Sequence, residues 1–252
     1  MNDAGSTPGL PTAELRPGVF RPDWSVVKLD AARRTLQRRL GAHPAGVARW
    51  AGLEPQDDLA WRTVLGLFVE QGRAPQAHDV ARVTTRTLEQ ALSSLRLLRA
   101  RDLVVLDGSD TSVLAAYPFT SRETGHQVTI NGRALHALCA IDALGAGAMS
   151  GADTTIASAC PCCGEPIRVE TRGNGRELRS VAPAAAVVWY TLVFDGCAAQ
   201  SCCPSTLFFR DDAHLQRWLE AGRLRQRGDR LGMAEALEIG IALFAPLLAR
   251  AA

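Results

Sequence analysis

The chain has 252 residues, of which 47% are hydrophobic and 21% charged, with a formal net charge of +2. This length suffices for one large or two small domains with a buried core, and the near-neutral charge gives little electrostatic reason to expect nucleic acid as a partner. Seven cysteines, with no basic and apolar leader at the start of the sequence, favour metal binding or catalysis in a reducing, cytoplasmic setting over disulfides. The longest apolar run, 239–252, is too short to span a bilayer, so we expect no membrane contact.

The first half of the chain is predicted to be mainly helical. Residues 1–24 are rich in Pro, Gly and Thr and show no hydrophobic period, which is typical of a flexible lead-in. The spacing of apolar residues then predicts helices and one strand pair, in the order helix 29–40, helix 59–71, helix 77–83, helix 88–100 and strand pair 103–117. Because a helix-turn-helix followed by a strand pair is the layout of a winged helix, we expect a winged-helix-like domain over residues 25–118.

The second half is predicted to be a mixed domain over residues 119–252, which makes the fold class α+β with short, mostly antiparallel strands. Its first strand is expected over 126–130, followed by a turn at Asn131-Gly132 and a helix over 133–144 that Gly145 and Gly147 end. The elements expected after that are strands within 154–160, 166–171, 187–194 and 205–209, and helices over 211–222 and 233–251. Asp211 and Asp212 are well placed at the positive N-terminal end of the first of these helices.

Six of the seven cysteines lie in two clusters, "ACPCCGEPI" (159–167) and "GCAAQSCCPSTLFF" (196–209). The C-x-x-C-G spacing of Cys160 and Cys163 is typical of a zinc turn, and Cys197 with Cys202 or Cys203 offers a second, irregular pair of ligands. A structural zinc site joined to a winged helix would make a transcriptional regulator or a metal sensor without turnover. DNA is an improbable partner for it, however, because the expected recognition helix presents no clear row of polar side chains for base edges.

The seventh cysteine lies in "LHALCAIDAL", three residues before an aspartate. On a helix, Cys139 and Asp142 would point from the same face, beside an apolar stripe that faces inward. A buried cysteine is often only a packing residue, but a buried carboxyl needs a partner or a purpose. Soft thiolates capture a soft metal centre, and an acid that burial keeps protonated supplies a proton to a leaving group. His136 is a candidate for lowering the thiol pKa, although a lone histidine is more typical of packing.

Three segments together resemble the organomercurial (alkylmercury) lyase family. They are "YPFTSRETGHQVTINGRALHALCAIDAL", with its C-x-x-D, "IASACPCCGEPIRV", with a cysteine before Gly-x-Pro, and "QSCCPSTLFFRDDAHLQRWL", with a cysteine before paired aromatics. They occur in the order found in the family, and the resemblance covers about residues 60–225. It implies an enzyme that breaks a carbon–mercury bond by protonolysis, in which two cysteine thiolates grip mercury and an aspartate delivers the proton to the leaving carbon.

Carried over residue by residue, the resemblance assigns catalysis to Cys139, Asp142 and Cys203, with the two thiols also holding the Hg(II) product. Cys202 stands where the family more often has an aromatic residue, which leaves open which of these neighbours is the second catalytic thiol. Cys160 matches a cysteine that supports structure in the family.

The chain also departs from the family pattern. Cys162, Cys163 and Cys197 are additions, and Leu207 stands where a histidine is frequent. The extra thiols are candidates for relaying Hg(II) or for holding a structural zinc. The resemblance implies a small organometallic substrate, no required cofactor, and small thiols or a mercuric reductase as acceptors of Hg(II). A relative redirected to a non-mercurial substrate is a further alternative.

Overall fold

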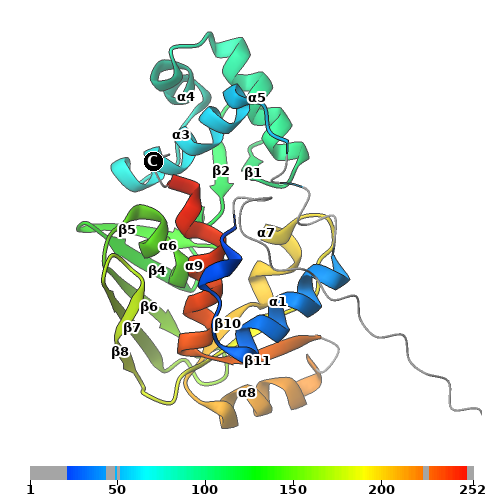
Figure 1. The fold of residues 1–252 in the computed structure, drawn as a ribbon, viewed down its shortest axis with the longest axis vertical. Coiled ribbons are helices and arrows are strands. Elements are labelled where there is room, and N and C mark those ends of the chain that lie inside the picture. The colour runs from blue at the N-terminus through cyan, green and yellow to red at the C-terminus, as the bar shows by residue number, and fades with distance from the viewer. Residues whose placement is uncertain (1–21, 44–48, 50–51, 224–226, 249–252) are drawn as a thin grey trace, which may run out of the picture.

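A computed structural model describes residues 22–43, 49, 52–223 and 227–248. Figure 1 shows a helical layer at one end of the molecule, an antiparallel sheet along one side, and two helices through the centre. The protein is thus of mixed α+β class, as predicted. Most of the expected lead-in, residues 1–21, lies outside the described residues. None of the described helices is long and apolar enough to cross a membrane.

The N-terminal part is built from helices that end where the sequence supplies caps. Gly72, with a left-handed φ of 69°, ends helix α3 (Pro55–Gln71). Thr87 caps the start of helix α5 (Leu88–Ala100), where its side chain accepts a hydrogen bond from Gln90 N at 3.2 Å. The elements are η1 (Trp24–Val26), α1 (Asp30–Ala42), α3 (Pro55–Gln71), α4 (Ala77–Thr84), α5 (Leu88–Ala100), β1 (Val104–Leu106) and β2 (Val113–Ala116). This is the predicted order of helices and strand pair. The winged-helix assignment itself and the division at residue 118 stay predictions.

The main sheet has eight strands in the order β1-β2-β3-β5-β4-β6-β7-β8, and every neighbouring pair is antiparallel. Beyond β2 its strands are β3 (Phe119–Thr120), β4 (His126–Ile130), β5 (Arg133–Ala137), β6 (Thr154–Ala159), β7 (Pro166–Arg172) and β8 (Glu177–Ala182). A smaller antiparallel sheet has the order β10-β9-β11 and consists of β9 (Val187–Thr191), β10 (Leu207–Phe209) and β11 (Gly228–Gly232). The patterns in the sequence predict no strand at β3, β8 or β11.

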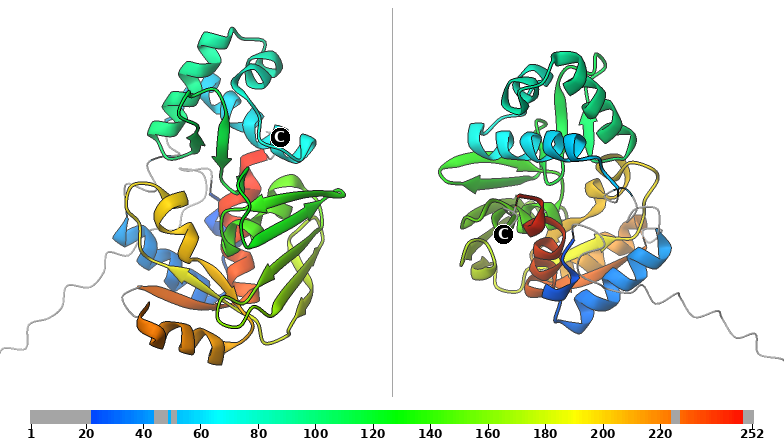
Figure 2. Two further views of the ribbon diagram at one scale, coloured as in Figure 1. Left: turned by 180° about the vertical axis from the view of Figure 1, so that it is seen from behind. Right: turned by 45° about the horizontal axis from the view of Figure 1, so that its top comes forward.

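The remaining helices are α6 (Ala140–Ser150), α7 (Ala198–Ser201), η2 (Cys203–Ser205), α8 (Asp212–Trp218), the π-helical turn η3 (Leu219–Arg223) and α9 (Met233–Leu248). Figure 2 shows α9 passing through the middle of the molecule. Helix α6 packs on β4, β5 and β6, and α9 fills the space between α6 and the smaller sheet. Asp211 caps α8 as predicted, accepting a hydrogen bond from His214 N at 2.8 Å.

Two predictions around residue 140 were wrong. The expected helix over 133–144 is instead strand β5 followed by a helix that starts only at Ala140, because Asn131 and Gly132 adopt φ values of 49° and 78°, which suit a hairpin turn between two strands. Gly145 and Gly147 do not end this helix either, since it runs to Ser150.

The glycines of α6 serve packing, not termination. A Cβ on Gly145 would lie 2.6 Å from the carbonyl oxygen of Gly240 on α9 and would also strike the ring of Phe244. On Gly147 it would lie 2.9 Å from the Cα of Gly175. Helices α6 and α9 can approach this closely because neither Gly145 nor Gly240 carries a side chain, and the bareness of Gly147 admits the turn between β7 and β8.

Candidate active site

Cys139 lies between β5 and α6, at the N-cap position of the helix. Its backbone is extended, with φ −156°, and its sulfur accepts a hydrogen bond from Asp142 N at 3.4 Å. Asp142 sits in the first turn of α6. The two side chains are therefore neighbours because a cap residue reaches back over the first helical turn, and not because they share a helical face as predicted.

Cys203 is brought to the same place by the turn that joins α7 to β10. Thr206 N donates to Cys203 O at 3.1 Å, and Thr206 O accepts from Ala140 N at 3.0 Å. That second bond ties the turn directly to the start of α6. The buried Thr206 hydroxyl also donates to Cys202 O at 3.1 Å, so the turn is held on both sides.

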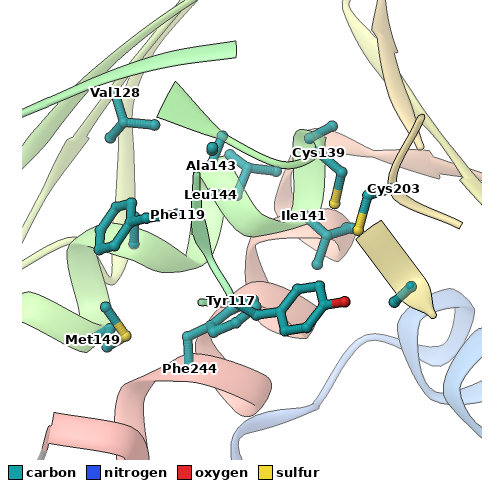
Figure 3. Packing of buried hydrophobic residues seen from close by; sticks show 14 of the residues in the cluster. Tyr117, Phe119, Val128, Cys139, Ile141, Ala143, Leu144, Met149, Cys203 and Phe244 are labelled. Carbon is teal, nitrogen blue, oxygen red and sulfur yellow. The ribbon is translucent and has the colours of Figure 1, made fainter. Parts of the chain in front are cut away.

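Cys139, Asp142 and Cys203 each place one ligand atom within 4.8 Å of the others. The Cys203 thiol donates to Asp142 Oδ2 at 3.6 Å, and the side chains are only 3%, 4% and 4% exposed, in chain order. Figure 3 shows the sulfur atoms of Cys139 and Cys203 lying next to each other. The structure thus brings together the two thiols and the carboxyl that the sequence singled out.

Burial controls the protonation of this cluster. It raises the pKa of Cys139 to about 12 and that of Asp142 to about 7. The pKa of Cys203 is raised well above its ordinary value by hydrogen bonds with Cys139 and Cys202 and by burial. The two thiols therefore keep their protons in the resting protein, and Asp142 is poised to hold or lose one near neutral pH.

Cys202 differs from its neighbour because it meets a cation. Arg39, on α1, donates from Nη2 to Cys202 Sγ at 2.8 Å and from Nη1 to Thr191 O at 2.6 Å, and its guanidinium lies 4.4 Å from the ring centre of Tyr190. A hydrogen bond from Cys203 and the charge of Arg39 lower the pKa of Cys202 to about 5, against the effect of burial. One thiolate therefore sits beside the two protonated thiols, balanced by the half-buried Arg39.

Tyr117 and Asp102 hold the start of α7. The Tyr117 hydroxyl donates to Asp102 Oδ1 at 2.7 Å and accepts from Ala199 N at 2.9 Å, while Asp102 Oδ2 accepts from Ala198 N at 3.1 Å and is paired with Arg49. Burial and the Asp102 charge raise the pKa of Tyr117, so its hydroxyl stays protonated and can donate. These contacts fix the segment that carries Cys202 and Cys203.

Two cavities meet at Cys203. A small one of about 50 Å³ is lined by the thiols and carboxyl together with Arg39, Tyr190 and apolar residues of α9. A larger one of about 390 Å³, on the other side, is lined among others by Arg122, His126 and Pro161. Burial lowers the pKa of His126 to about 4, so its ring is neutral. Cys203 thus borders both cavities, and its thiol is directed at Asp142.

The other cysteines do not join this cluster. Cys160 is buried at the end of β6, Cys162 is half-buried, Cys163 is exposed, and Cys197 precedes α7. In the part of the chain that the structure describes, Cys139, Asp142 and Cys203 form the only group of three or more potential ligands within 4.8 Å. The four-thiol zinc site considered from the sequence is therefore not assembled here, and a structural zinc stays a prediction.

Sequence reasoning missed Arg39, since the helix "DAARRTLQRRLGA" carries several arginines and nothing in it marks the one that turns inward. His136 is not on the cysteine-bearing helix as expected. It lies on β5, where its Nδ1 accepts a hydrogen bond from Thr124 N at 3.4 Å. Its proposed effect on the thiol pKa stays untested.

A family model, curated relatives and a solved structure all point to the same family of proteins. The family model of alkylmercury lyase (MerB) matches residues 119–245, just over half of the 252 residues. Alkylmercury lyase of Bacillus cereus is 26% identical over 170 residues, covering 67% of this chain and 73% of the relative, and that of Staphylococcus epidermidis is 26% identical over 181 residues, covering 71% and 79%. The crystal structure of the mercury-bound form of MerB2 superimposes with a TM-score of 0.69 at 25% identity, covering 82% of this chain and 98% of that one.

Proposed function

Since the chain belongs to the alkylmercury lyase family, we propose that it cleaves the carbon–mercury bond of a small organomercurial by protonolysis, releasing a hydrocarbon and Hg(II). The observation that carries this proposal is the buried cluster in which Cys139, Asp142 and Cys203 place two sulfurs and a carboxyl oxygen within 4.8 Å of one another. Two soft ligands and one proton donor are what the reaction needs.

The first step is capture of the substrate, written R–Hg–SR′ for a mercurial carried by a small thiol. Cys139 replaces the small thiolate on mercury, and the proton of Cys139 leaves with it as R′SH. Cys203 then adds to mercury as the second sulfur, and its proton passes to Asp142, whose Oδ2 already accepts the Cys203 thiol at 3.6 Å. Mercury now carries R and two sulfurs, and Asp142 is neutral.

Protonolysis follows from this arrangement. A second sulfur loads electron density onto mercury and thence onto the bound carbon, which makes that carbon easier to protonate. Asp142 gives its proton to the carbon as the carbon–mercury bond breaks, so that R–H leaves and mercury stays between the two sulfurs. The balance is R–Hg–SR′ plus two thiols giving R–H, R′SH and one mercury bis-thiolate, with no oxidation or reduction.

The environment of the cluster supports these roles. Burial raises the pKa of Asp142 to about 7, which suits a group that takes a proton in one step and gives it up in the next. The raised pKa values of Cys139 and Cys203 keep both thiols protonated until mercury displaces their protons. We assign Cys202 to a supporting role, because its sulfur is already paired with Arg39.

The reaction as written needs no cofactor. We propose a small thiol, or the thiols of a mercuric reductase, as the acceptor of Hg(II), and a cytoplasmic setting that keeps the cysteines reduced. Neither DNA nor a membrane has a part in this function.

The proposal is tested with purified protein, phenylmercury and an excess of a small thiol, with benzene as the measured product. Cys139→Ser and Cys203→Ser are each expected to abolish benzene formation, whereas Cys202→Ser, the matched change one residue away, retains it. Loss with Cys202→Ser and full activity with Cys203→Ser would exchange the roles of the two neighbours. Full activity in Cys139→Ser would refute the assignment.

A further inference from the structure

The turn between β6 and β7 gathers three cysteines that protonolysis does not use. Its backbone is closed by Cys160 O, which accepts from Cys163 N at 3.3 Å and from Gly164 N at 2.7 Å, and by Cys160 N, which donates to Glu165 O at 2.9 Å. Gly164 has a φ of +77°, a conformation that favours glycine. The turn brings the thiol of the exposed Cys163 into hydrogen-bonding contact with that of the buried Cys160.

A paired C-x-x-C turn is a strong site for a soft cation. Two sulfurs that are held together before binding lose little entropy when one ion joins them, and thiolates select soft metals over hard ones. Burial and the contact with Cys160 raise the pKa of Cys163, and the positive charge of Arg210, directly after β10 and anchored by Glu165 of the same turn, acts against this rise. The turn therefore favours a soft ion through the preformed pair of sulfurs, whose protons are displaced on binding.

The position of the turn connects it to the reactive cluster. Ala159 and Pro161, which flank Cys160 in the chain, line the cavity of about 390 Å³, and Cys203 lines the same cavity. Strand β10, which follows Cys203, also packs beside β6, which ends at the turn. One cavity thus touches both Cys203 and the residues that flank Cys160 in the turn.

We propose that Cys160 and Cys163 form a second, surface-accessible Hg(II) site, which takes the ion from Cys139 and Cys203 through this cavity and presents it to an acceptor thiol. Transfer is ligand exchange, in which two mercury–sulfur bonds form at the turn, two break at the cluster, and the protons of Cys160 and Cys163 pass to Cys139 and Cys203. No electrons are transferred. Binding at the turn goes beyond the proposed lyase activity, whereas the direction of transfer rests on it.

The test is a titration of the reduced full-length protein with Hg(II) chloride in an excess of a monothiol, which outcompetes single cysteines but not paired ones. Mercury–thiolate absorbance and the amount of mercury retained after gel filtration give the stoichiometry. We expect two tightly held equivalents in the wild type and one in Cys163→Ser, with affinity at the turn falling about a hundredfold or more because a two-point attachment becomes a one-point attachment. Cys197→Ser, the matched change at a thiol outside both sites, keeps two.

Cys163 is exposed, so its replacement leaves the fold intact, which circular dichroism checks. A second measurement uses Cys139→Ser/Cys203→Ser, in which one equivalent is expected and is lost when Cys163→Ser is added. Two equivalents retained in Cys163→Ser, or a single equivalent in the wild type, would overturn the second site. Benzene formation is measured separately, so failure of the lyase proposal and failure of this one are distinguishable.

Discussion

Asp142 offers the sharpest prediction, because its role depends on a shifted pKa. Replacing it with asparagine keeps the size of the side chain but removes the transferable proton. We expect cleavage of phenylmercury to fall by about 10²–10⁴-fold, the usual contribution of a positioned general acid. Capture of the substrate should persist, since both sulfurs remain.

The pKa of about 7 that burial gives Asp142 also sets the pH dependence of the wild type. With that pKa, about 90% of the carboxyl is protonated at pH 6 and about 10% at pH 8. Once both sulfurs hold mercury, Asp142 must be protonated to deliver its proton, so the rate of benzene formation from this captured complex should fall about tenfold between these values, and Asp142→Asn should lack this decline. A rate that rises from pH 6 to pH 8, or an Asp142→Asn variant as active as the wild type, would refute the reasoning.

The same shift has a consequence for stability. A carboxyl whose pKa is raised on folding stabilises the folded state fully below its unfolded value, 3.8, and this contribution is lost as pH rises through about 7. The lowered pKa of Cys202 makes the folded state more stable as pH rises between about 5 and 9, but this contribution is the same in the wild type and in Asp142→Asn. The wild type should thus lose stability relative to Asp142→Asn between pH 4 and 7, as urea midpoints would show.

Two further predictions concern Arg39 and Gly145. Arg39→Met removes the cation beside Cys202, so the pKa of that thiol should rise above about 5 and the ultraviolet thiolate absorbance at neutral pH should fall. Arg38→Met, on the same helix, should leave the absorbance unchanged. An unchanged absorbance in both variants would contradict the pairing of Arg39 with Cys202. Gly145→Ala should destabilise the protein by about 1–3 kcal/mol through overpacking of α6 against α9. Gly66→Ala should not, because a Cβ there meets nothing within 4 Å. Equal urea midpoints for the two variants would refute the close approach of Gly145 to Gly240.

The sequence predicted the fold class and most elements because local patterns determine them. The alternating strands and the cap at Asp211 depend on neighbours in the chain. The wrong helix over 133–144 arose where an apolar run suited either a strand or a helix, and pairing with β4 decided for the strand. Gly145 was misread because its partner, Gly240, is distant in the chain.

The candidate site was predicted unevenly for the same reason. Cys139 and Asp142 are three residues apart, and the resemblance supplied Cys203, so a short motif and an order of segments sufficed. Arg39 is 163 residues from Cys202 in the chain, and no local pattern distinguishes it from the other arginines of α1. Which of two adjacent thiols faces a carboxyl depends on the direction of a turn, which only the folded chain defines.

The most direct test of the account is a single turnover of phenylmercury in deuterated water, with enzyme in excess. Protonolysis from an exchangeable carboxyl predicts one benzene carrying one deuterium for each mercury added, and mercury left on Cys139 and Cys203 as a bis-thiolate. Phenylmercury that remains intact on the protein, with no benzene released, would contradict the claim that this cluster breaks the carbon–mercury bond.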